Sequence, residues 1–315
     1  MPESRIGVVG ATGAVGRIAL ELLSERGHRR IRAFASARSA GSHLPYGEGD
    51  LVVEEATPEA LSAGDLDFCL FSAKTQASRE LVPHAVRGGA VCIDKSSAFR
   101  LTAGVPLVVP EVNGERALEH AGIVANPNCC AIPLTCALKP LSDEAGLARV
   151  VVSTYQSASG AGAQAMERLR ATAPAAADLA MDWDFDGEEF DEETKLREET
   201  RKILELPELP LSATCMRVPV LVGHAEAVWV ETKTPLAPER ALELLANAPG
   251  LRTTDFPTPA QAAGGDDILV GRVRRDHTIA NGLVLLVAGD NLRKGAALNA
   301  IQIVELLLAR QALAA

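Results

Sequence analysis

Cys129 is the side chain of this sequence best placed for covalent chemistry. It lies in the run Ala125-Asn126-Pro127-Asn128-Cys129-Cys130, between an apolar, strand-like segment and a helical pattern over 131–141. The dipole and the free N–H groups at a helix N-terminus lower the pKa of a thiol placed there. We therefore predict a nucleophilic thiolate at Cys129. The alternative is a small buried thiol of the core, which is the most common fate of a cysteine.

A second chemical signal is a glycine-rich turn near the N-terminus. The segment Gly10-Ala11-Thr12-Gly13-Ala14-Val15-Gly16 follows a strand pattern at 5–10 and opens a helical pattern at 14–27. Glycines let the backbone approach a pyrophosphate, and the N–H groups of the first helical turn bind its oxygens. The turn therefore predicts a dinucleotide site, with a tight turn that binds nothing as the alternative. The predicted contacts are Gly10, Thr12, Gly13, Ala14, Val15 and Gly16.

The end of the second predicted strand, 31–35, indicates which dinucleotide is bound. In NAD sites an acidic residue usually stands about 20 positions after the glycine motif and binds the ribose hydroxyls. Here the sequence is Ala35-Ser36-Ala37-Arg38-Ser39, without a carboxylate. Ser36, Arg38 and Ser39 offer donors and positive charge for a 2′-phosphate, so NADP(H) is the predicted cofactor. The alternative is that Arg38 is a solvated loop charge.

The elements that must position these residues alternate in the first half of the chain. Strand patterns at 5–10, 31–35, 51–53, 66–71, 90–93, 105–109 and 122–125 are separated by helical patterns at 14–27, 76–87 and 115–121. Such alternation is typical of an α/β domain with a parallel sheet of βαβ units. The second half has β-branched strands with shorter links: strands at 150–155, 216–231, 268–274 and 283–288, and helices at 160–173, 195–206 and 295–310.

Length and composition set the outer limits. The 315 residues suggest about two domains, which we place at 1–127 and 128–294, with the final helix, 295–315, packing back on the first. The formal net charge is −10, from 31 basic and 41 acidic residues, which argues against nucleic acid as a partner. We expect a cytoplasmic protein, because no leader pattern or membrane-length apolar run is present. The six cysteines lack zinc-ligand spacing, so no metal is predicted.

Nine short motifs follow one another along the chain: GATGAVG (10–16), ASARSAG (35–41), SSAFR (96–100), VPEVN (109–113), NPNC (126–129), STYQSASGAG (153–162), EETK (192–195), RVPVLVGH (217–224) and DNLRKGAALNA (290–300). In that order they resemble the aspartate-semialdehyde dehydrogenase family over nearly the whole chain. The resemblance implies an N-terminal Rossmann-like dinucleotide-binding domain. It also implies a C-terminal α+β catalytic and dimerisation domain, as in the glyceraldehyde-3-phosphate dehydrogenase fold.

The resemblance also implies an activity and residue roles. The activity is the reversible, NADPH-dependent reductive dephosphorylation of L-4-aspartyl phosphate to L-aspartate 4-semialdehyde and phosphate, in lysine, threonine and methionine biosynthesis. Cys129 would form a thioacyl intermediate, His224 would act as general acid and base, and Gln156 would orient the acyl group. The implied substrate contacts are Arg100, Asn128 and Lys195 for phosphate, Arg217 for the α-carboxylate and Glu192 for the ammonium group. Further implied cofactor contacts are Ser72, Ser159, Gly160 and Asn291. A homodimer or homotetramer would form through the sheet of the second domain.

Several of these residues have ordinary alternatives. In an unbroken strand, Arg217 and His224 would lie on opposite faces, unless Pro219 and Gly223 interrupt it. Glu192 and Lys195 are one helical turn apart, as in a common surface pair. Gln156 could cap a turn, and Arg100 could be one more surface charge.

The chain also departs from the family pattern, with Cys130 where a hydroxyl residue is more usual and Lys74 where glycine is usual. The acidic stretch 182–193 matches a calcium-loop pattern through Asp182, Asp184, Asp186, Gly187 and Glu193. We favour a solvated loop instead, because Glu189 stands where such loops place an apolar residue. Two rival functions remain: a reductase for another acyl phosphate or an acyl-CoA, and an inactive paralogue that only binds a nucleotide.

Overall fold

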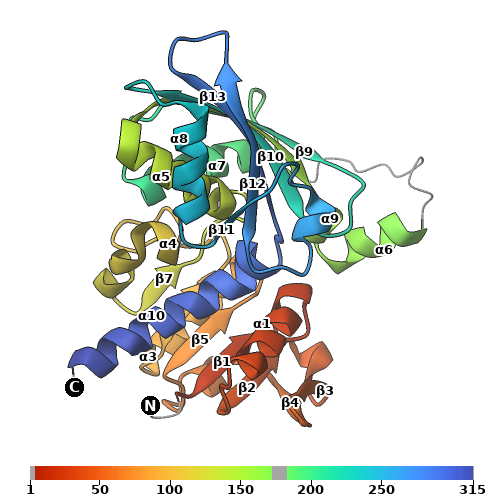
Figure 1. Cartoon of the computed structure of the whole chain (residues 1–315). Coiled ribbons are helices and arrows are strands. Elements are labelled where there is room, and N and C mark those ends of the chain that lie inside the picture. The colour runs from red at the N-terminus through yellow and green to blue at the C-terminus, as the bar shows by residue number, and fades with distance from the viewer. Residues whose placement is uncertain (1–3, 172–182, 315) are drawn as a thin grey trace. The chain divides into compact units, whose positions relative to one another are not determined.

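The computed structural model describes residues 4–171 and 183–314. The chain forms two compact units: unit 1 comprises Met1–Pro127 and Ala296–Ala315, and unit 2 comprises Asn128–Gly295. Each unit contains its own sheet, seven-stranded in unit 1 and six-stranded in unit 2 (Figure 1). No described helix is long and apolar enough to cross a membrane.

The sheet of unit 1 has the order β3-β4-β2-β1-β5-β6-β7. All neighbouring pairs are parallel except β3 and β4, which form an antiparallel pair at one edge. Because the chain reverses direction across the sheet at β1, a crevice for a nucleotide is expected at the carboxyl ends of β1 and its neighbours. The strands are β1 (Ile6–Val9), β2 (Ile31–Ala35), β3 (His43–Tyr46), β4 (Gly49–Glu55), β5 (Phe68–Phe71), β6 (Val91–Asp94) and β7 (Ile123–Ala125).

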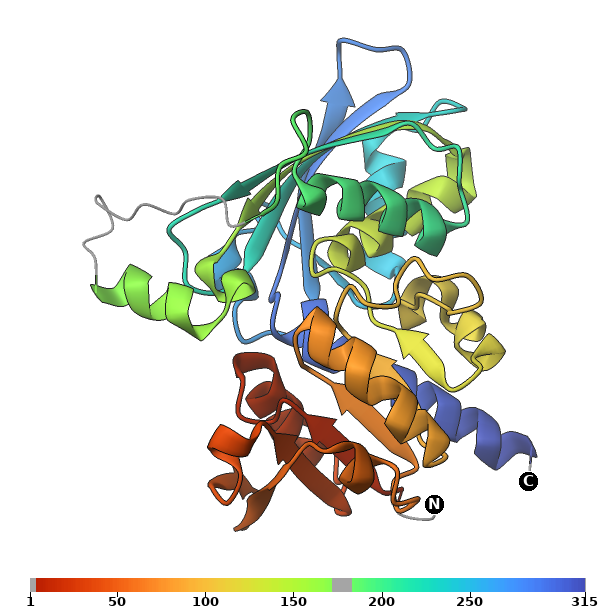
Figure 2. The ribbon, with the colours of Figure 1, turned by 180° about the vertical axis from the view of Figure 1, so that it is seen from behind.

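Helices cover both faces of this sheet (Figures 1 and 2). On one face, α1 (Ala14–Glu25) and α10 (Leu298–Ala314) pack on a core that includes Ile6, Val8 and Phe68. On the other, α2 (Pro58–Leu61) and α3 (Thr75–Arg87) pack on Val9 and Phe71. Neighbouring residues of β1 thus point into opposite cores, which accounts for the continuous apolar runs of a doubly covered sheet. Shorter helices are η1 (Ala37–Ser39), α4 (Pro110–Asn113) and η2 (Gly114–Glu119).

The sheet of unit 2 has the order β11-β12-β13-β10-β8-β9. Its strands are β8 (Leu147–Gln156), β9 (Leu211–Arg217), β10 (His224–Thr232), β11 (Leu251–Thr253), β12 (Ile268–Asp276) and β13 (Gly282–Gly289). Burial alternates along its central strands: Val150, Val152, Thr154 and Gln156 of β8 are buried, whereas the residues between them are more exposed. The buried side is called the inner face below.

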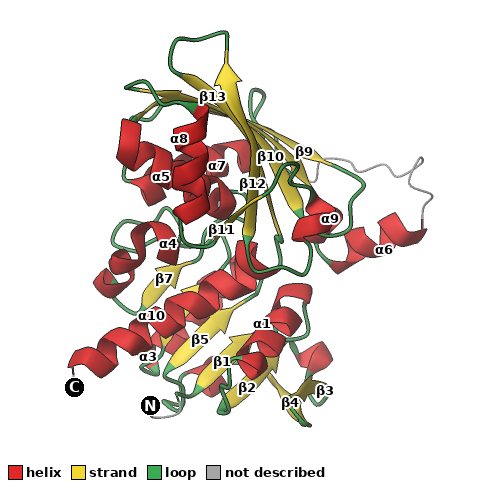
Figure 3. Ribbon diagram, viewed as in Figure 1, coloured by secondary structure: helices red, strands yellow, loops and turns green. Residues whose placement is uncertain are grey.

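Helices α5 (Ala131–Ala145), α7 (Asp191–Leu204) and α8 (Pro238–Asn247) lie against one side of this sheet, as the views in Figures 2 and 3 agree. They cover the inner face, since they contact β9, β10, β12 and β13 and the alternating residues there are buried. Smaller helical pieces are η3 (Ala158–Ala161), α6 (Ala163–Ala171), α9 (Pro259–Ala262) and the π-helical turn η5 (Arg293–Ala297).

Two predictions for unit 1 were wrong. The segment 105–109 forms no strand and contributes only an isolated bridge between Leu107 and Ala125. Pro106 and Pro110 remove the N–H donors that a ladder needs at both ends of the segment. The predicted helix over 115–121 is the 3-10 helix η2, which follows the single turn α4. Strand β3, at the sheet edge, was not predicted at all, because its alternation covers only four residues.

In unit 2, the segment predicted as one strand over 216–231 is two strands. β9 ends at Arg217 and β10 begins at His224, with a loop containing Pro219 and Gly223 between them. Gly223 has φ 92°, and a Cβ there would stand 2.5 Å from the Pro259 carbonyl oxygen.

Two predicted helices in unit 2 have different starts. The predicted helix 160–173 begins only at Ala163, and its last two residues lie outside the described residues. The predicted helix 195–206 begins earlier, at Asp191, and ends at Leu204. Three carboxylates in its first turn interact favourably with the positive end of the helix dipole.

Candidate active site

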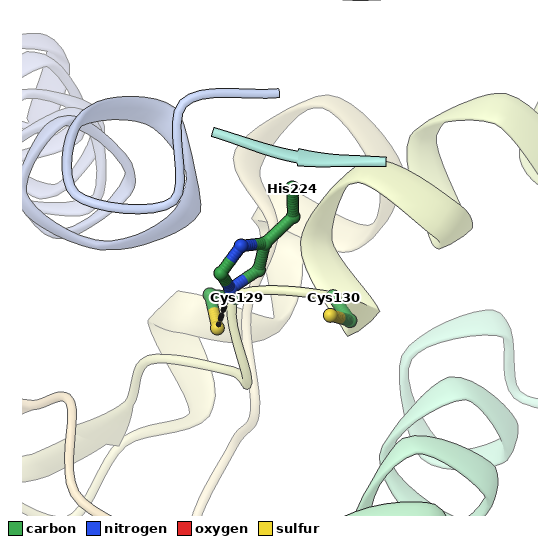
Figure 4. Close-up of side chains that lie close together, drawn as sticks. All are labelled: Cys129, Cys130 and His224. Atoms are coloured by element: carbon green, nitrogen blue, oxygen red, sulfur yellow. Dashed lines mark hydrogen bonds between the residues drawn. The ribbon is translucent and has the colours of Figure 1, made fainter. Parts of the chain in front are cut away.

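Cys129 lies in unit 2 just before α5, whose N-cap is Cys130. Its side chain is partly exposed, whereas the other five cysteines are buried. Its sulfur is 3.3 Å from Nε2 of His224, and Figure 4 shows the sulfur turned toward the imidazole ring. The helix N-terminus and the nearby ring provide the two features that activate a cysteine nucleophile.

Strand register gathers the predicted residues on the inner face of unit 2. Gln156 ends β8 and pairs with Arg217, which ends the parallel strand β9. His224 begins β10, which runs antiparallel to β8 and pairs Ala225 with Tyr155. The three strand ends therefore meet, and His224, Gln156 and Arg217 form one row, called the upper row below. The loop break at 218–223 is what allows Arg217 and His224 to share a face, against the alternative expected for an unbroken strand.

The hydrogen bonds of His224 select one tautomer of the ring. The backbone N–H of Ser157 donates to Nδ1 over 3.0 Å, and the Ser157 hydroxyl lies 3.1 Å from the same atom. Because a backbone N–H can only donate, Nδ1 accepts, and the proton of the neutral ring is on Nε2, facing Cys129. The imidazole is thus oriented as a hydrogen-bond donor toward the sulfur and toward any oxygen that develops charge beside it.

Behind Ser157 a small buried network fixes this arrangement. The Oδ1 atom of Asn291 accepts hydrogen bonds from the Ser157 hydroxyl, the Ser159 hydroxyl and the Gly223 backbone N–H. Asn291 therefore joins the end of β13 to the loop that precedes His224. Gly160 stands against the same site, since a Cβ there would lie 2.9 Å from the Arg217 guanidinium and 3.4 Å from the His224 ring. Ser157 belongs to the motif STYQSASGAG, but the sequence alone assigned no role to it.

Glu192 is the centre of a second group. Its carboxylate Oε1 accepts hydrogen bonds from the side-chain amides of Asn128 (2.9 Å) and Gln156 (3.0 Å). The Lys195 ammonium is 3.7 Å from Glu192 Oε2 and 2.6 Å from Asp191. Glu192 is buried, so the pair is more than the exposed surface pair considered as its alternative. The structure thus brings Asn128, Gln156, Glu192 and Lys195 together.

Glu199 is a buried residue of this site that sequence reasoning missed. Its Oε2 accepts the backbone N–H of Asn128 over 2.6 Å, and the Asn128 side chain accepts the N–H of Cys130 over 2.8 Å. These bonds hold the backbone on both sides of Cys129. The available signal was spacing: Glu192 and Glu199 are seven residues apart and therefore share one face of α7.

Arg217 is held at the end of β9 by two contacts. Its guanidinium donates to the Ser157 carbonyl oxygen over 3.0 Å, and it lies over the ring of Trp183, 4.7 Å from the centroid. The Trp183 stacking was not predicted, because nothing in the local sequence connects position 183 with position 217. A guanidinium can stack on an aromatic face and can also pair with a carboxylate through its planar fork of N–H groups.

The predicted cofactor residues of unit 1 lie at strand ends of its sheet. The turn Gly10–Gly16 joins β1 to α1, the triad Ser36, Arg38 and Ser39 follows β2, and Ser72 follows β5. Gly10 has φ 82°, and a Cβ on Gly16 would stand 2.2 Å from the Gly10 carbonyl oxygen. A Cβ on Gly13 would meet only that same oxygen, at 3.3 Å. Gly10 and Gly16 are therefore required by the fold of the turn itself, and the turn resembles the phosphate-binding geometry of Rossmann domains.

Arg100 belongs to unit 1. It is buried, and its Nε donates to the carbonyl oxygen of Asn126, three residues before Cys129 in the sequence. Lys74, the departure noted in the sequence, is the exposed N-cap residue of α3.

The structure gives no support to a calcium loop. Glu193 would supply the last ligand, but its two carboxylate oxygens accept the backbone N–H groups of Phe190 and Cys215. Asp182 lies outside the described residues. The donor atoms of Cys129, Cys130 and His224 lie within 4.8 Å of one another. A metal would need the lone pair of Nε2, and the Ser157 N–H already places the ring proton there, so a resident metal does not fit.

Comparisons with known proteins show which family this chain resembles. Residues 5–120 match the model of the semialdehyde dehydrogenase NAD binding domain, and residues 138–294 match that of the semialdehyde dehydrogenase dimerisation domain. The chain is 43% identical to the aspartate-semialdehyde dehydrogenase of Streptomyces akiyoshiensis, over 97% of this chain and 98% of that protein. It is 42% identical to the enzyme of Aquifex aeolicus, over 96% and 98% respectively.

Solved structures give the same result. A Vibrio cholerae aspartate semialdehyde dehydrogenase II, complexed with ASA, aligns with a TM-score of 0.93 and 38% identity, over 98% of this chain and 99% of that chain. The Candida albicans aspartate semialdehyde dehydrogenase with NADP aligns with a TM-score of 0.80 and 26% identity, over 98% and 99%. The chain belongs to the aspartate-semialdehyde dehydrogenase family.

Proposed function

We propose that Cys129 and the residues around it carry out the family's reaction in this chain with NADPH as the reductant. The reaction is the reversible conversion of L-4-aspartyl phosphate into L-aspartate 4-semialdehyde and phosphate, in lysine, threonine and methionine biosynthesis. The observation that carries the proposal is the 3.3 Å distance between the sulfur of Cys129, just before α5, and Nε2 of His224, at the start of β10.

In the proposed mechanism Cys129 attacks the acyl carbon, phosphate leaves with the C–O bond electrons, and a thioester remains on Cys129. When bound, NADPH would supply the hydride that reduces this thioester. His224 donates its Nε2 hydrogen bond to the oxygen of the tetrahedral species and exchanges a proton with it. When the C–S bond breaks, the aldehyde forms and the electron pair returns to the sulfur. The Nδ1 contact with Ser157 keeps the Nε2 proton directed at this oxygen.

Substrate recognition follows from the charges around the sulfur. Arg217, oriented by Trp183, is proposed to bind the α-carboxylate through its guanidinium donors. Glu192 is proposed to bind the ammonium group, and Gln156, fixed by Glu192 over 3.0 Å, to orient the acyl carbon. Lys195 and Asn128, with Arg100 of unit 1, are the proposed phosphate contacts. A free amino acid requires both charges, so this set disfavours an acyl-CoA or an N-acetylated substrate.

The cofactor proposal rests on two features of unit 1. The N-terminus of α1 behind Gly13 suits a pyrophosphate, and exposed Ser36 and Arg38 after β2 suit a 2′-phosphate. An acidic residue near the end of the second strand is typical of NAD sites, and Glu55 of β4 pairs with Ala35 at that place. The cofactor preference is therefore tested with NADP and NAD side by side. Ser159, Gly160 and Asn291 of unit 2 are the remaining proposed cofactor contacts.

A homodimer or homotetramer is the proposed assembly. The face of the unit 2 sheet opposite the inner face carries Tyr155 and Met216, which are neighbours in the ladder and are 39% and 45% exposed. The partly exposed Trp229 of β10 lies on the same side. A second copy of the dimerisation domain would cover these side chains. The cytoplasmic location stays a prediction.

The test is the reverse reaction with purified protein, L-aspartate semialdehyde, phosphate and either NADP or NAD. We expect phosphate-dependent formation of NADPH, followed by its absorbance, and much slower formation of NADH. Turnover with NAD but not with NADP would support the enzyme activity and overturn the cofactor assignment. Turnover with N-acetylglutamate semialdehyde but not with aspartate semialdehyde would overturn the substrate assignment. No turnover with any substrate by folded, reduced protein would identify an inactive paralogue.

A further inference from the structure

A second row of buried side chains lies next to the upper row on the inner face of unit 2. Glu226 is two residues after His224 on β10, so its side chain points to the same side. In the ladder Glu226 pairs with Thr154 of β8, and Thr154 pairs with Cys215 of β9. We call Glu226, Thr154 and Cys215 the lower row. None of the three is more than 1% exposed, and the proposed mechanism uses none of them.

The carboxyl group of Glu226 is unusual because both of its oxygens are buried and neither makes a hydrogen bond of ordinary geometry among the described residues, although the Cys130 thiol is close enough to lower its pKa. Burial raises its pKa well above the ordinary value, and the nearby Cys129 thiolate raises it further. An ionised carboxylate in such a place is strongly disfavoured, because it loses its hydration without gaining a partner of opposite charge. Glu226 therefore stays a neutral carboxylic acid to a higher pH than an exposed glutamate.

Cys130 is close to this carboxyl group and to Cys129 at the same time. Its sulfur accepts a hydrogen bond from Nε2 of Gln156 over 2.9 Å, which leaves its own S–H proton to be donated elsewhere. Its sulfur and that of Cys129 are within 4.8 Å of each other. Burial raises the pKa of the Cys130 thiol well above its ordinary value, as do hydrogen bonding to Cys129 and the charge of Glu226. The thiol thus has one proton and two possible acceptors.

We propose that Cys130 is a positioning residue whose single thiol proton is shared between the sulfur of Cys129 and the carboxyl group of Glu226. While Glu226 is neutral, Cys130 donates to the Cys129 thiolate and stabilises it. When Glu226 ionises, the thiol donates to the carboxylate instead, and Cys129 loses a donor and gains a nearby negative charge. Glu226 thereby sets the nucleophilicity of Cys129. This inference rests on the proposed role of Cys129 as the nucleophile.

Other charged groups near the lower row have their own partners. On α7, Glu192 accepts hydrogen bonds from Asn128 and Gln156, and Glu193 accepts the N–H groups of Phe190 and Cys215. The thiols of Cys129 and Cys130 face the row from the start of α5, Cys215 faces it from β9, and His224 precedes it on β10. Among these described carboxyl groups, Glu226 is the one that depends on Cys130 for a donor.

The experiment measures the rate at which iodoacetamide alkylates Cys129 as a function of pH, in the full chain without substrate. The Cys129 peptide is quantified by mass spectrometry, so turnover is not needed. For the unmodified sequence we expect a profile spread over more than one proton step, because Cys129 and Glu226 ionise against each other. Glu226→Gln cannot ionise, so its profile should be a single step with higher reactivity at the alkaline end.

Two variants of Cys130 test the donor. Cys130→Ala removes the S–H and should slow alkylation near neutral pH about fivefold, shifting the profile to higher pH. Cys130→Ser restores a donor and should restore the profile. Cys136→Ala, which removes another buried thiol from α5, is the matched control and should leave the profile unchanged. Thermal unfolding and NADPH binding confirm that each variant is folded.

An alkaline limb of Glu226→Gln identical to that of the unmodified chain would overturn the proposal, and so would a Cys130→Ala profile without a shift. The proposed function is tested separately by turnover of Cys129→Ser. If that variant remained active, the nucleophile assignment would fail whatever the alkylation profiles show. If it were inactive while the profiles of the Cys130 and Glu226 variants did not move, only the present inference would fail.

Discussion

The glycine-rich turn of unit 1 and the Cys129 cluster of unit 2 build their sites in opposite ways. The turn uses backbone from seven consecutive residues, Gly10–Gly16, and two of its glycines are demanded by local geometry. The cluster uses side chains from residues as far apart as Cys129 and His224, 95 positions distant in the sequence. A site made of consecutive backbone is encoded locally, whereas a side-chain cluster exists only when strand register has brought its members together. The two regions should therefore respond differently to substitution.

The largest expected effect is that of Cys129→Ser. A hydroxyl at this position is a far weaker nucleophile, so turnover should fall by more than about a thousandfold. Binding of NADPH, measured by fluorescence titration, should be unchanged, because the dinucleotide turn belongs to unit 1. Cys136→Ser, which changes a thiol in the helix that follows Cys129, is the control for loss of a thiol. Substantial turnover by Cys129→Ser would remove the basis for treating the cluster as catalytic.

The next effect concerns the turn. In Gly16→Ala the new Cβ would stand 2.2 Å from the Gly10 carbonyl oxygen, so β1 and α1 must separate. We expect unfolding of the chain to become easier by about 2–4 kcal/mol in chemical denaturation. Gly13→Ala is the matched comparison, since its Cβ meets that oxygen only at 3.3 Å. It should keep the stability and lose NADPH affinity. Equal stability of the two variants would contradict the packing role assigned to Gly16.

A smaller loss is expected when the support of Asn128 is weakened. Glu199→Gln replaces the carboxyl acceptor of the Asn128 N–H by an amide, so the backbone before Cys129 is held less firmly. We expect kcat to fall about tenfold with little change in KM. Glu198→Gln, which alters a more exposed neighbour paired with Arg197 and Arg201, should be indistinguishable from the unmodified chain. A change confined to KM would instead indicate a contact with substrate.

Arg38→Ala should affect one cofactor only. Loss of the guanidinium after β2 is expected to raise the KM for NADPH about fivefold while leaving that for NADH unchanged. Steady-state kinetics with both cofactors provide the measurement, and Arg29→Ala, an exposed arginine before β2, is the control. An equal change for both cofactors would contradict contact with the 2′-phosphate.

The smallest effect is a pH-dependent difference in stability. Glu226 has a folded-state pKa raised by burial, whereas an unfolded glutamate titrates near its ordinary value of about 4.3. The folded state therefore holds a proton that the unfolded state releases, and its stability falls as the pH rises above that value. Glu226→Gln lacks this loss, so its Tm relative to the unmodified chain should increase from pH 5 to pH 8 by a few degrees (about 2–5 °C). A constant Tm difference across this range would show that Glu226 is ionised in the folded protein.

The sequence determined the chemistry of single positions and the local elements. The β1–turn–α1 unit and the start of α5 just after Cys130 follow from short-range patterns of glycine and apolar spacing. The absence of a carboxylate just after β2 is read directly from the residues there. These features depend on neighbours within a few residues, so they can be recognised in the chain itself. The same is true of the motifs that indicate the family.

Only the tertiary structure decided which residues face each other. That Arg217 and His224 share a face depends on the loop at 218–223, and that Glu226 is buried on the same face as His224 depends on the register of β8, β9 and β10. The roles of Ser157, Trp183 and Glu199 also required coordinates, since their partners are distant in the sequence. The physical reason is that a shift of one residue in strand pairing moves every side chain to the other face. Register is fixed by packing of the whole sheet against α5, α7 and α8, and no local pattern records it.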